Sequence, residues 1–95
     1  MRMDRKLALR IACDALNPHI DTVLRPIPDD EQLDISKALK NIEDKNPEEL
    51  NDIVRVIVKE SKAAGYDTSI NPPALLRCDV MGDLVTEIRN SSSKS

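Results

Sequence analysis

His19 is the single histidine of the chain, so it is the first residue to consider for acid–base chemistry. No serine or cysteine is placed by the sequence as an obvious nucleophilic partner for it. The proline directly before it indicates a local role instead, in which the imidazole hydrogen-bonds a backbone carbonyl that Pro18 leaves without its helical donor. We therefore expect no catalytic residue and no enzyme activity.

Cys13 and Cys78 could form a zinc site with His19 and an acid, but zinc ligands usually come in closely spaced pairs, and these three are isolated. The two glycines are too few for a phosphate-binding loop, and no P-loop, HExxH or EF-hand pattern occurs. We expect no metal and no cofactor. Both cysteines are expected as small buried thiols in a reducing cytosol, and a single disulfide is the alternative.

Charged residues near the C-terminus are the best candidates for contact with a partner. Asp79, Asp83 and Glu87 recur every four residues and predict an acidic ridge on one helix, suited to a basic partner. Arg77 falls within the apolar arc of the same helix, where an interface arginine is one interpretation and a snorkelling side chain the other. The alternative for the ridge is a solvated face, or one that faces Arg55, Lys59 and Lys62.

The N-terminal segment is basic although the whole chain has a net charge of −3. Lys6 and Arg10 belong to one polar stripe and could contact phosphate, but Asp14 and Asp21 follow on the same stripe. Tyr66 is the only aromatic residue, so stacking on nucleic-acid bases is not available. A protein partner is therefore favoured over nucleic acid, with Lys6 and Arg10 kept as candidate contact residues.

Three Asn-Pro dipeptides divide the chain, because asparagine is a favoured N-cap and proline is favoured at the first helical position. At Asn17-Pro18 the apolar face continues in phase from Leu16 to Leu24, which predicts one helix over about 4–25 with a kink near Pro18. Its apolar arc spans about two thirds of the wheel, far wider than the ~100° of a surface helix. This helix is therefore either central or in contact with a second copy.

Further helices are predicted over about 30–44, 47–64 and 72–90, with Gly65 ending the third in a left-handed conformation. Gly82 lies on the polar side of the last helix and indicates a bend or a close neighbour. The serine-rich tail 91–95 is expected to be disordered. The fold class is all-α: one helical domain over 1–90, arranged as a small antiparallel four-helix bundle.

These observations lead by elimination to a small cytoplasmic protein that binds another protein or regulates it, without catalysis, and self-association is a natural form of this function. No segment is apolar for long enough to span a membrane. The alternative class is a nucleic-acid-associated regulator that uses the basic N-terminus. An enzyme that uses His19 is a third class, and it requires a cleft around the predicted kink.

Overall fold

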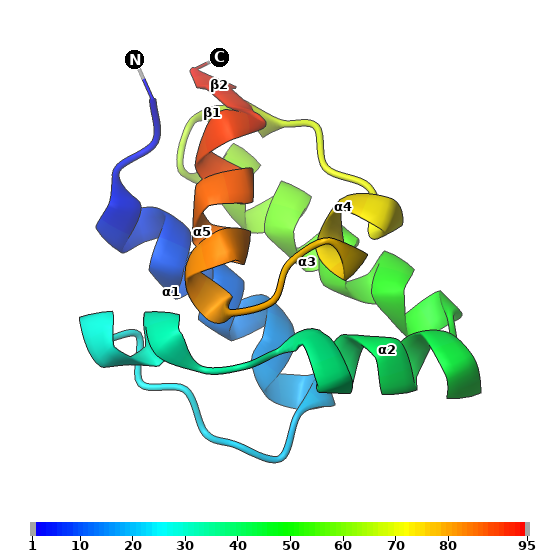
Figure 1. Cartoon of the computed structure of the whole chain (residues 1–95). Helices are drawn as coiled ribbons and strands as arrows, with labels where there is room; N and C mark the ends of the chain where they lie inside the picture. Colours follow the sequence, from blue (N-terminus) through cyan, green and yellow to red (C-terminus); the bar gives the residue numbers. More distant parts are fainter. Residues whose placement is uncertain (1, 95) are drawn as a thin grey trace.

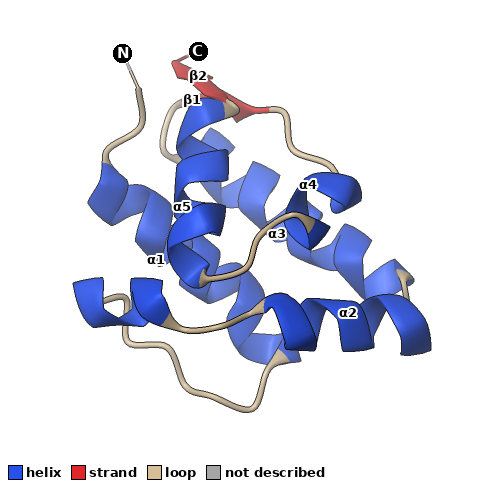
Figure 2. Ribbon diagram, viewed as in Figure 1, coloured by secondary structure: helices blue, strands red, loops and turns tan. Residues whose placement is uncertain are grey.

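The computed structural model describes residues 2–94, and it is mostly helical, which confirms the all-α class. Five α-helices are connected by irregular segments, two 3₁₀ turns (η1 and η2) and a small two-stranded sheet (Figure 1 and Figure 2). In chain order the elements are α1 (Arg5–Leu16), η1 (Asn17–His19), η2 (Pro28–Gln32), α2 (Ser36–Lys45), α3 (Glu48–Ala63), β1 (Tyr66–Thr68), α4 (Pro72–Leu76), α5 (Met81–Asn90) and β2 (Ser92–Lys94).

Helix α1 lies at the centre of the core and packs against both α3 and α5. The residues that it buries surround most of its axis: Ala8, Leu9, Ile11, Ala12, Cys13, Ala15 and Leu16. Its wide apolar arc is therefore used inside the chain, as the first of the two interpretations of the sequence requires. Because neighbouring helices cover this arc, its width no longer calls for a second copy.

The prediction of one kinked helix over 4–25 is wrong, because α1 ends at Leu16 and residues 20–27 are irregular. Pro18 has no N–H to continue the helix. The Asn17 side chain then accepts a hydrogen bond from the backbone N–H of Leu24 at 3.0 Å, which closes a loop instead. Leu24 is buried and Ile20 is partly buried against the core, so these two apolar residues pack as parts of a loop, whereas Val23 is 80% exposed.

The second predicted helix begins later than expected, and the third agrees closely with prediction. Residues 28–32 form the 3₁₀ turn η2, and α2 starts at Ser36 rather than near residue 30. Helices α2 and α3 are joined by the short Asn46-Pro47 turn and pack against each other. Gly65 follows α3 with φ of +92°, a left-handed conformation that a residue with a Cβ rarely adopts.

The predicted helix over 72–90 is also wrong, because the chain breaks between α4 and α5. The backbone near Val80 pairs with the segment before α2 in an antiparallel bridge to Asp34. Ile35 N–H donates to the carbonyl of Asp79, and Met81 N–H donates to the carbonyl of Leu33, both at 2.9 Å. In a continuous helix the Asp79 carbonyl would accept from residue 83 and the Met81 N–H would donate to residue 77, but here the segment before α2 takes both groups.

Gly82 lies in the first turn of α5, not in the middle of a long helix. A Cβ at this position would come within 3.2 Å of the carbonyl oxygen of Glu31. The glycine therefore admits the close approach of η2, which is the second of the two roles that the sequence suggested for it.

The tail was expected to be disordered, but residues 92–94 form β2 and pair antiparallel with β1. Ser92 is buried, its hydroxyl donates to the carbonyl of Ile88 at 2.6 Å, and it lies 2.7 Å from the hydroxyl of Thr68. Ser95 lies outside the described residues. With five helices and this sheet within residues 2–94, the predicted antiparallel four-helix bundle is not confirmed.

Candidate binding site

A cleft of about 440 Å³ lies between the loop that follows η1 and the N-terminal half of α2. We call it the α2 cleft. Its polar lining comes from His19, Asp21, Thr22, Asp34, Lys37 and Asn41. Its apolar lining comes from Ile20, Leu33, Ile35 and Ala38. The volume is within the ~300–1,000 Å³ range of ligand sites, and the mixed lining is typical of them. Figure 1 shows the loop after α1 passing the start of α2 at the lower edge of the view.

One wall of the α2 cleft is a loop without regular secondary structure, and two polar side chains fix its course. Asn17 holds the backbone of Leu24, as described above. The buried Asp30 carboxylate accepts hydrogen bonds from the backbone N–H groups of Arg25 at 2.8 Å and Ile27 at 3.3 Å. Hydrogen bonds to loop N–H groups stabilise a defined path, so this wall has a definite shape.

The other wall is the start of α2, where the Asp34 side chain bonds the first helical residue, Ser36. The Asp34 carboxylate accepts hydrogen bonds from both the N–H and the hydroxyl of Ser36, each at 2.8 Å. These bonds, together with the charge of nearby Lys37, hold the pKa of the Asp34 carboxyl below its usual value. Asp34 is therefore engaged within the chain, and its charge is partly balanced.

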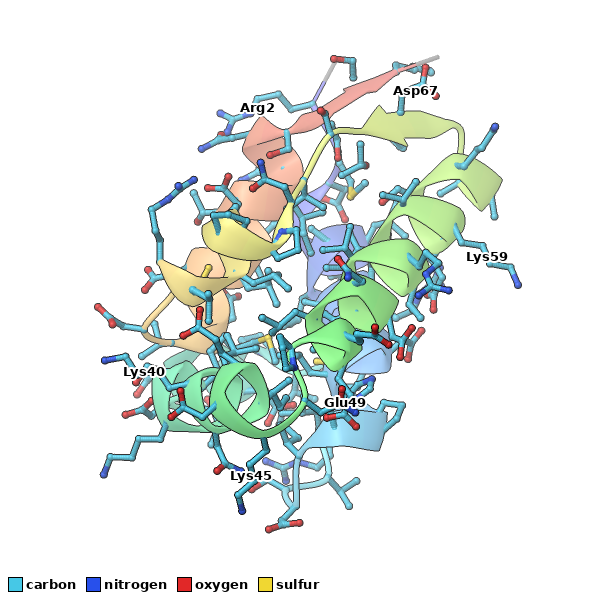
Figure 3. The ribbon with its side chains drawn as sticks, turned by 90° about the vertical axis from the view of Figure 1, so that its right-hand side faces the viewer. Arg2, Lys40, Lys45, Glu49, Lys59 and Asp67 are labelled. Carbon is cyan, nitrogen blue, oxygen red and sulfur yellow. The ribbon has the colours of Figure 1, made fainter. Side chains whose placement is uncertain are left out.

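His19 also lines the α2 cleft, with 13% of its side chain exposed. Its Nδ1 atom is buried, has no hydrogen-bond partner, and lies 3.8 Å from a carboxylate oxygen of Glu49 on α3. The predicted hydrogen bond from the imidazole to a nearby carbonyl is therefore absent on this nitrogen. Glu49 lies towards the same end of the molecule as Lys45, opposite to Asp67 (Figure 3).

Three polar side chains of the cleft wall are not used inside the chain. Within residues 2–94, the side chains of Asp21, Thr22 and Asn41 form no hydrogen bond or ion pair. Val23, directly after Thr22, is the large hydrophobic side chain that the described part of the chain leaves exposed. The site thus offers a charge, an amide, a hydroxyl and apolar surface to a ligand. The two walls come from separate segments, residues 19–22 and 33–41, and no sequence pattern links them.

The predicted acidic ridge is partly used within the fold. The Asp83 carboxylate accepts hydrogen bonds from the N–H groups of Asp79 at 3.0 Å and Val80 at 3.2 Å, so it caps α5. Glu87 lies 4.0 Å from the guanidinium of Arg77, whose side chain is 70% exposed. Arg77 and Glu87 therefore face each other across α4 and α5, and Asp79 stays exposed at the break between them.

The basic N-terminal residues are also drawn into contacts within the chain. Arg5 bonds the Glu31 carboxylate through Nε at 3.0 Å and lies 3.3 Å from the hydroxyl of Thr86. Arg2 hydrogen-bonds the side chain of Asn90. Lys6 is exposed and borders a smaller cleft of about 170 Å³ with Arg5 and Glu31. The Arg5–Glu31 ion pair offsets part of the positive charge that the segment would present to a nucleic acid.

Arg10 lies close to a pair of carboxyl groups that the sequence did not reveal. Glu60 on α3 donates a hydrogen bond to Asp14 on α1. Burial, followed by this hydrogen bond and the negative charge of Asp14, raises the pKa of Glu60 to about 7, and the charges of Arg10 and Lys59 oppose the rise. No signal in the sequence places Asp14 and Glu60 together, because they belong to different helices.

Cys13 and Cys78 are free and buried, as the sequence predicted. Burial, with smaller contributions from nearby carboxylates, raises the pKa of each thiol to about 11. Both thiols are therefore protonated and poorly nucleophilic at neutral pH. In residues 2–94, no three His, Cys, Asp or Glu side chains are grouped so that they could hold a metal ion.

No helix in the described part of the chain has both the length and the apolar character needed to cross a membrane. Comparison with protein-family models, with curated proteins and with solved structures gives no match to this chain.

Proposed function

We propose that the chain is a protein-binding module without catalytic activity of its own, and that a partner protein docks at the α2 cleft. The observation that carries this proposal is the set of unpaired polar side chains, Asp21, Thr22 and Asn41, around an apolar floor. Polar groups of this kind fix the orientation of a ligand, and the apolar floor provides affinity.

The neighbouring exposed Val23 extends the same surface. A single exposed valine is ordinary on a protein, but this one projects from a loop that two side chains, Asn17 and Asp30, hold in place. A fixed loop loses little conformational entropy on binding, which favours recognition by a preformed surface. Two buried thiols without a disulfide support a reducing cytosol as the place of action.

The ridge Asp79, Asp83 and Glu87 and the residue Arg77 give weaker support for docking. Asp83 and Glu87 have partners within the chain, so a ligand would compete with existing bonds. Arg10 lies near Asp14 and Glu60, and Lys6 lines a small cleft together with Glu31, so nearby carboxylates weaken the attraction of both residues for phosphate. We therefore base the proposal on the α2 cleft and not on these residues.

The test is to block the cleft and ask whether a partner is lost. Ala38→Trp introduces a large side chain at the cleft wall, and Ala63→Trp adds the same side chain to an exposed position near the far end of α3. We expect a protein that is captured in stoichiometric amount by the wild type and by Ala63→Trp, and that Ala38→Trp fails to capture. Equal capture by both variants, with both folded, would move the docking site away from the cleft.

A further inference from the structure

We infer that the α2 cleft takes an extended segment of the partner in which an aliphatic side chain stands beside a lysine or arginine. This inference rests on the proposed function, and it adds the chemistry of the occupant. Three features of the cleft lead to it: an unbalanced negative charge, an occupied helix N-terminus, and a free amide next to an apolar floor.

The charge of the cleft favours a cation. The Asp34 carboxylate accepts a hydrogen bond from Ser36, and the positive charge of Lys37 partly balances it. A ligand therefore meets only part of the negative charge of Asp34. Asp21, on the opposite wall, has no partner within the described residues and is exposed. A lysine or arginine beside Asp21 would form a charge-assisted hydrogen bond, the strongest polar contact that the cleft offers.

An anionic occupant is disfavoured because the N-terminus of α2 is already filled. Helix N-termini attract anions through backbone N–H groups that lack acceptors. Here the N–H of Ser36 donates to the Asp34 carboxylate at 2.8 Å and lies 3.3 Å from the carbonyl of Asp79, and the N–H of Ile35 donates to that same carbonyl. A phosphate or carboxylate would therefore find the Asp34 carboxylate at the place where it needs donors.

The remaining lining fits a polypeptide. Asn41 presents an amide that can donate and accept at once, which matches the N–H and C=O of an extended backbone. Leu33, Ile20 and Ala38 provide the apolar surface for one aliphatic side chain of that segment. A cation near Asp21 and an aliphatic group on this floor would be neighbours, since both walls border the same cleft.

The experiment selects ligands from a random collection, so the partner itself need not be identified first. A displayed library of random short peptides is enriched on the immobilised full chain. The best peptides are then titrated into isotope-labelled protein, and NMR shifts locate the contact. Affinity is compared between wild type, Asp21→Lys and Asp67→Lys, because both variants change the net charge equally and Asp67 is exposed at the opposite end of the molecule (Figure 3). Circular dichroism confirms that each variant is folded.

We expect enriched peptides that pair an aliphatic residue with lysine or arginine and that shift the signals of residues 19–23 and 33–41. Asp21→Lys should weaken them about tenfold or more, and Asp67→Lys about twofold at most. Peptides that bind the cleft without a basic residue, and equally in both variants, would overturn the inference while the proposed function stands. Peptides that bind elsewhere, or no enrichment, would overturn both.

Discussion

Replacement of Glu60 by glutamine should remove a pH dependence of folding that the Asp14–Glu60 pair creates. In the folded chain burial and the hydrogen bond to Asp14 raise the pKa of Glu60 from 4.5 to about 7. The folded state therefore binds a proton that the unfolded state has released at intermediate pH. The glutamine amide keeps a hydrogen-bond donor for Asp14 but has no charge to lose.

The sign follows from proton linkage. Because the pKa is higher in the folded state, the stabilising contribution of the Glu60 proton is fully present below about pH 4.5, and it is lost as the pH rises through about 7. A shift of this size corresponds to at most about 3 kcal/mol. Since Glu60 is partly exposed and water screens it, we expect about 1–2 kcal/mol in practice.

The assay is urea denaturation of wild type and Glu60→Gln from about pH 5 to about pH 8. At about pH 8 the free energy of unfolding of the variant should exceed that of the wild type by about 1–2 kcal/mol. At about pH 5 the two free energies should agree. Glu43→Gln, at an exposed position on α2, is the control and should follow the wild type. If the free energy of unfolding of Glu60→Gln changes with pH as steeply as that of the wild type, the proton between Glu60 and Asp14 does not exist.

Three further substitutions or reactions test the packing. Ser61→Ala should leave stability in thermal denaturation unchanged or raise it by up to about 1 kcal/mol, because the buried Ser61 hydroxyl has no hydrogen-bond partner. A loss of stability would show that the hydroxyl is hydrogen-bonded. Asp83→Ala should lower the free energy of unfolding in urea by about 1 kcal/mol, because the backbone N–H groups of Asp79 and Val80 lose their acceptor. An unchanged free energy of unfolding would refute this capping role. Cys13 and Cys78, with pKa values raised to about 11, should react with a thiol reagent at neutral pH far more slowly than in urea, and equal rates would contradict their burial.

Local sequence was enough for the elements whose limits are set by neighbouring residues. The Asn46-Pro47 dipeptide and Gly65 predicted the ends of α3 within one or two residues, because proline at a helix start and a left-handed glycine after its end act over a single turn. Asn71 accepts a hydrogen bond from the N–H of Ala74 at 3.2 Å, as expected for its Asn-Pro dipeptide. The wide apolar arc of α1 predicted a helix that is either central or in contact with a second copy, and the packing against α3 and α5 decides for the central position.

Tertiary structure decided where local signals compete with long-range backbone bonds. Asn17 preceded a proline as Asn71 did, yet its side chain bonds Leu24 and closes a loop. The helix predicted over 72–90 divides because the backbone of Val80 pairs with Asp34, far away in sequence. The periodicity of a sequence records which side chains are buried, and it does not record whether a helix or a packed loop buries them.

The candidate site depended on the same long-range arrangement. The sequence identified His19 as unusual, and His19 does line the α2 cleft, but the cleft exists because the loop after η1 lies against the start of α2. The sequence by itself determined the helical class, the limits of α3 and the buried thiols, and it left the central position of α1 as one of two alternatives. The tertiary structure determined the breaks near Pro18 and Val80, the pairing of the tail and the Asp14–Glu60 contact. Each of these features depends on contacts between groups that are far apart in sequence. Helix caps and left-handed glycines act over one helical turn, so they do not predict such contacts.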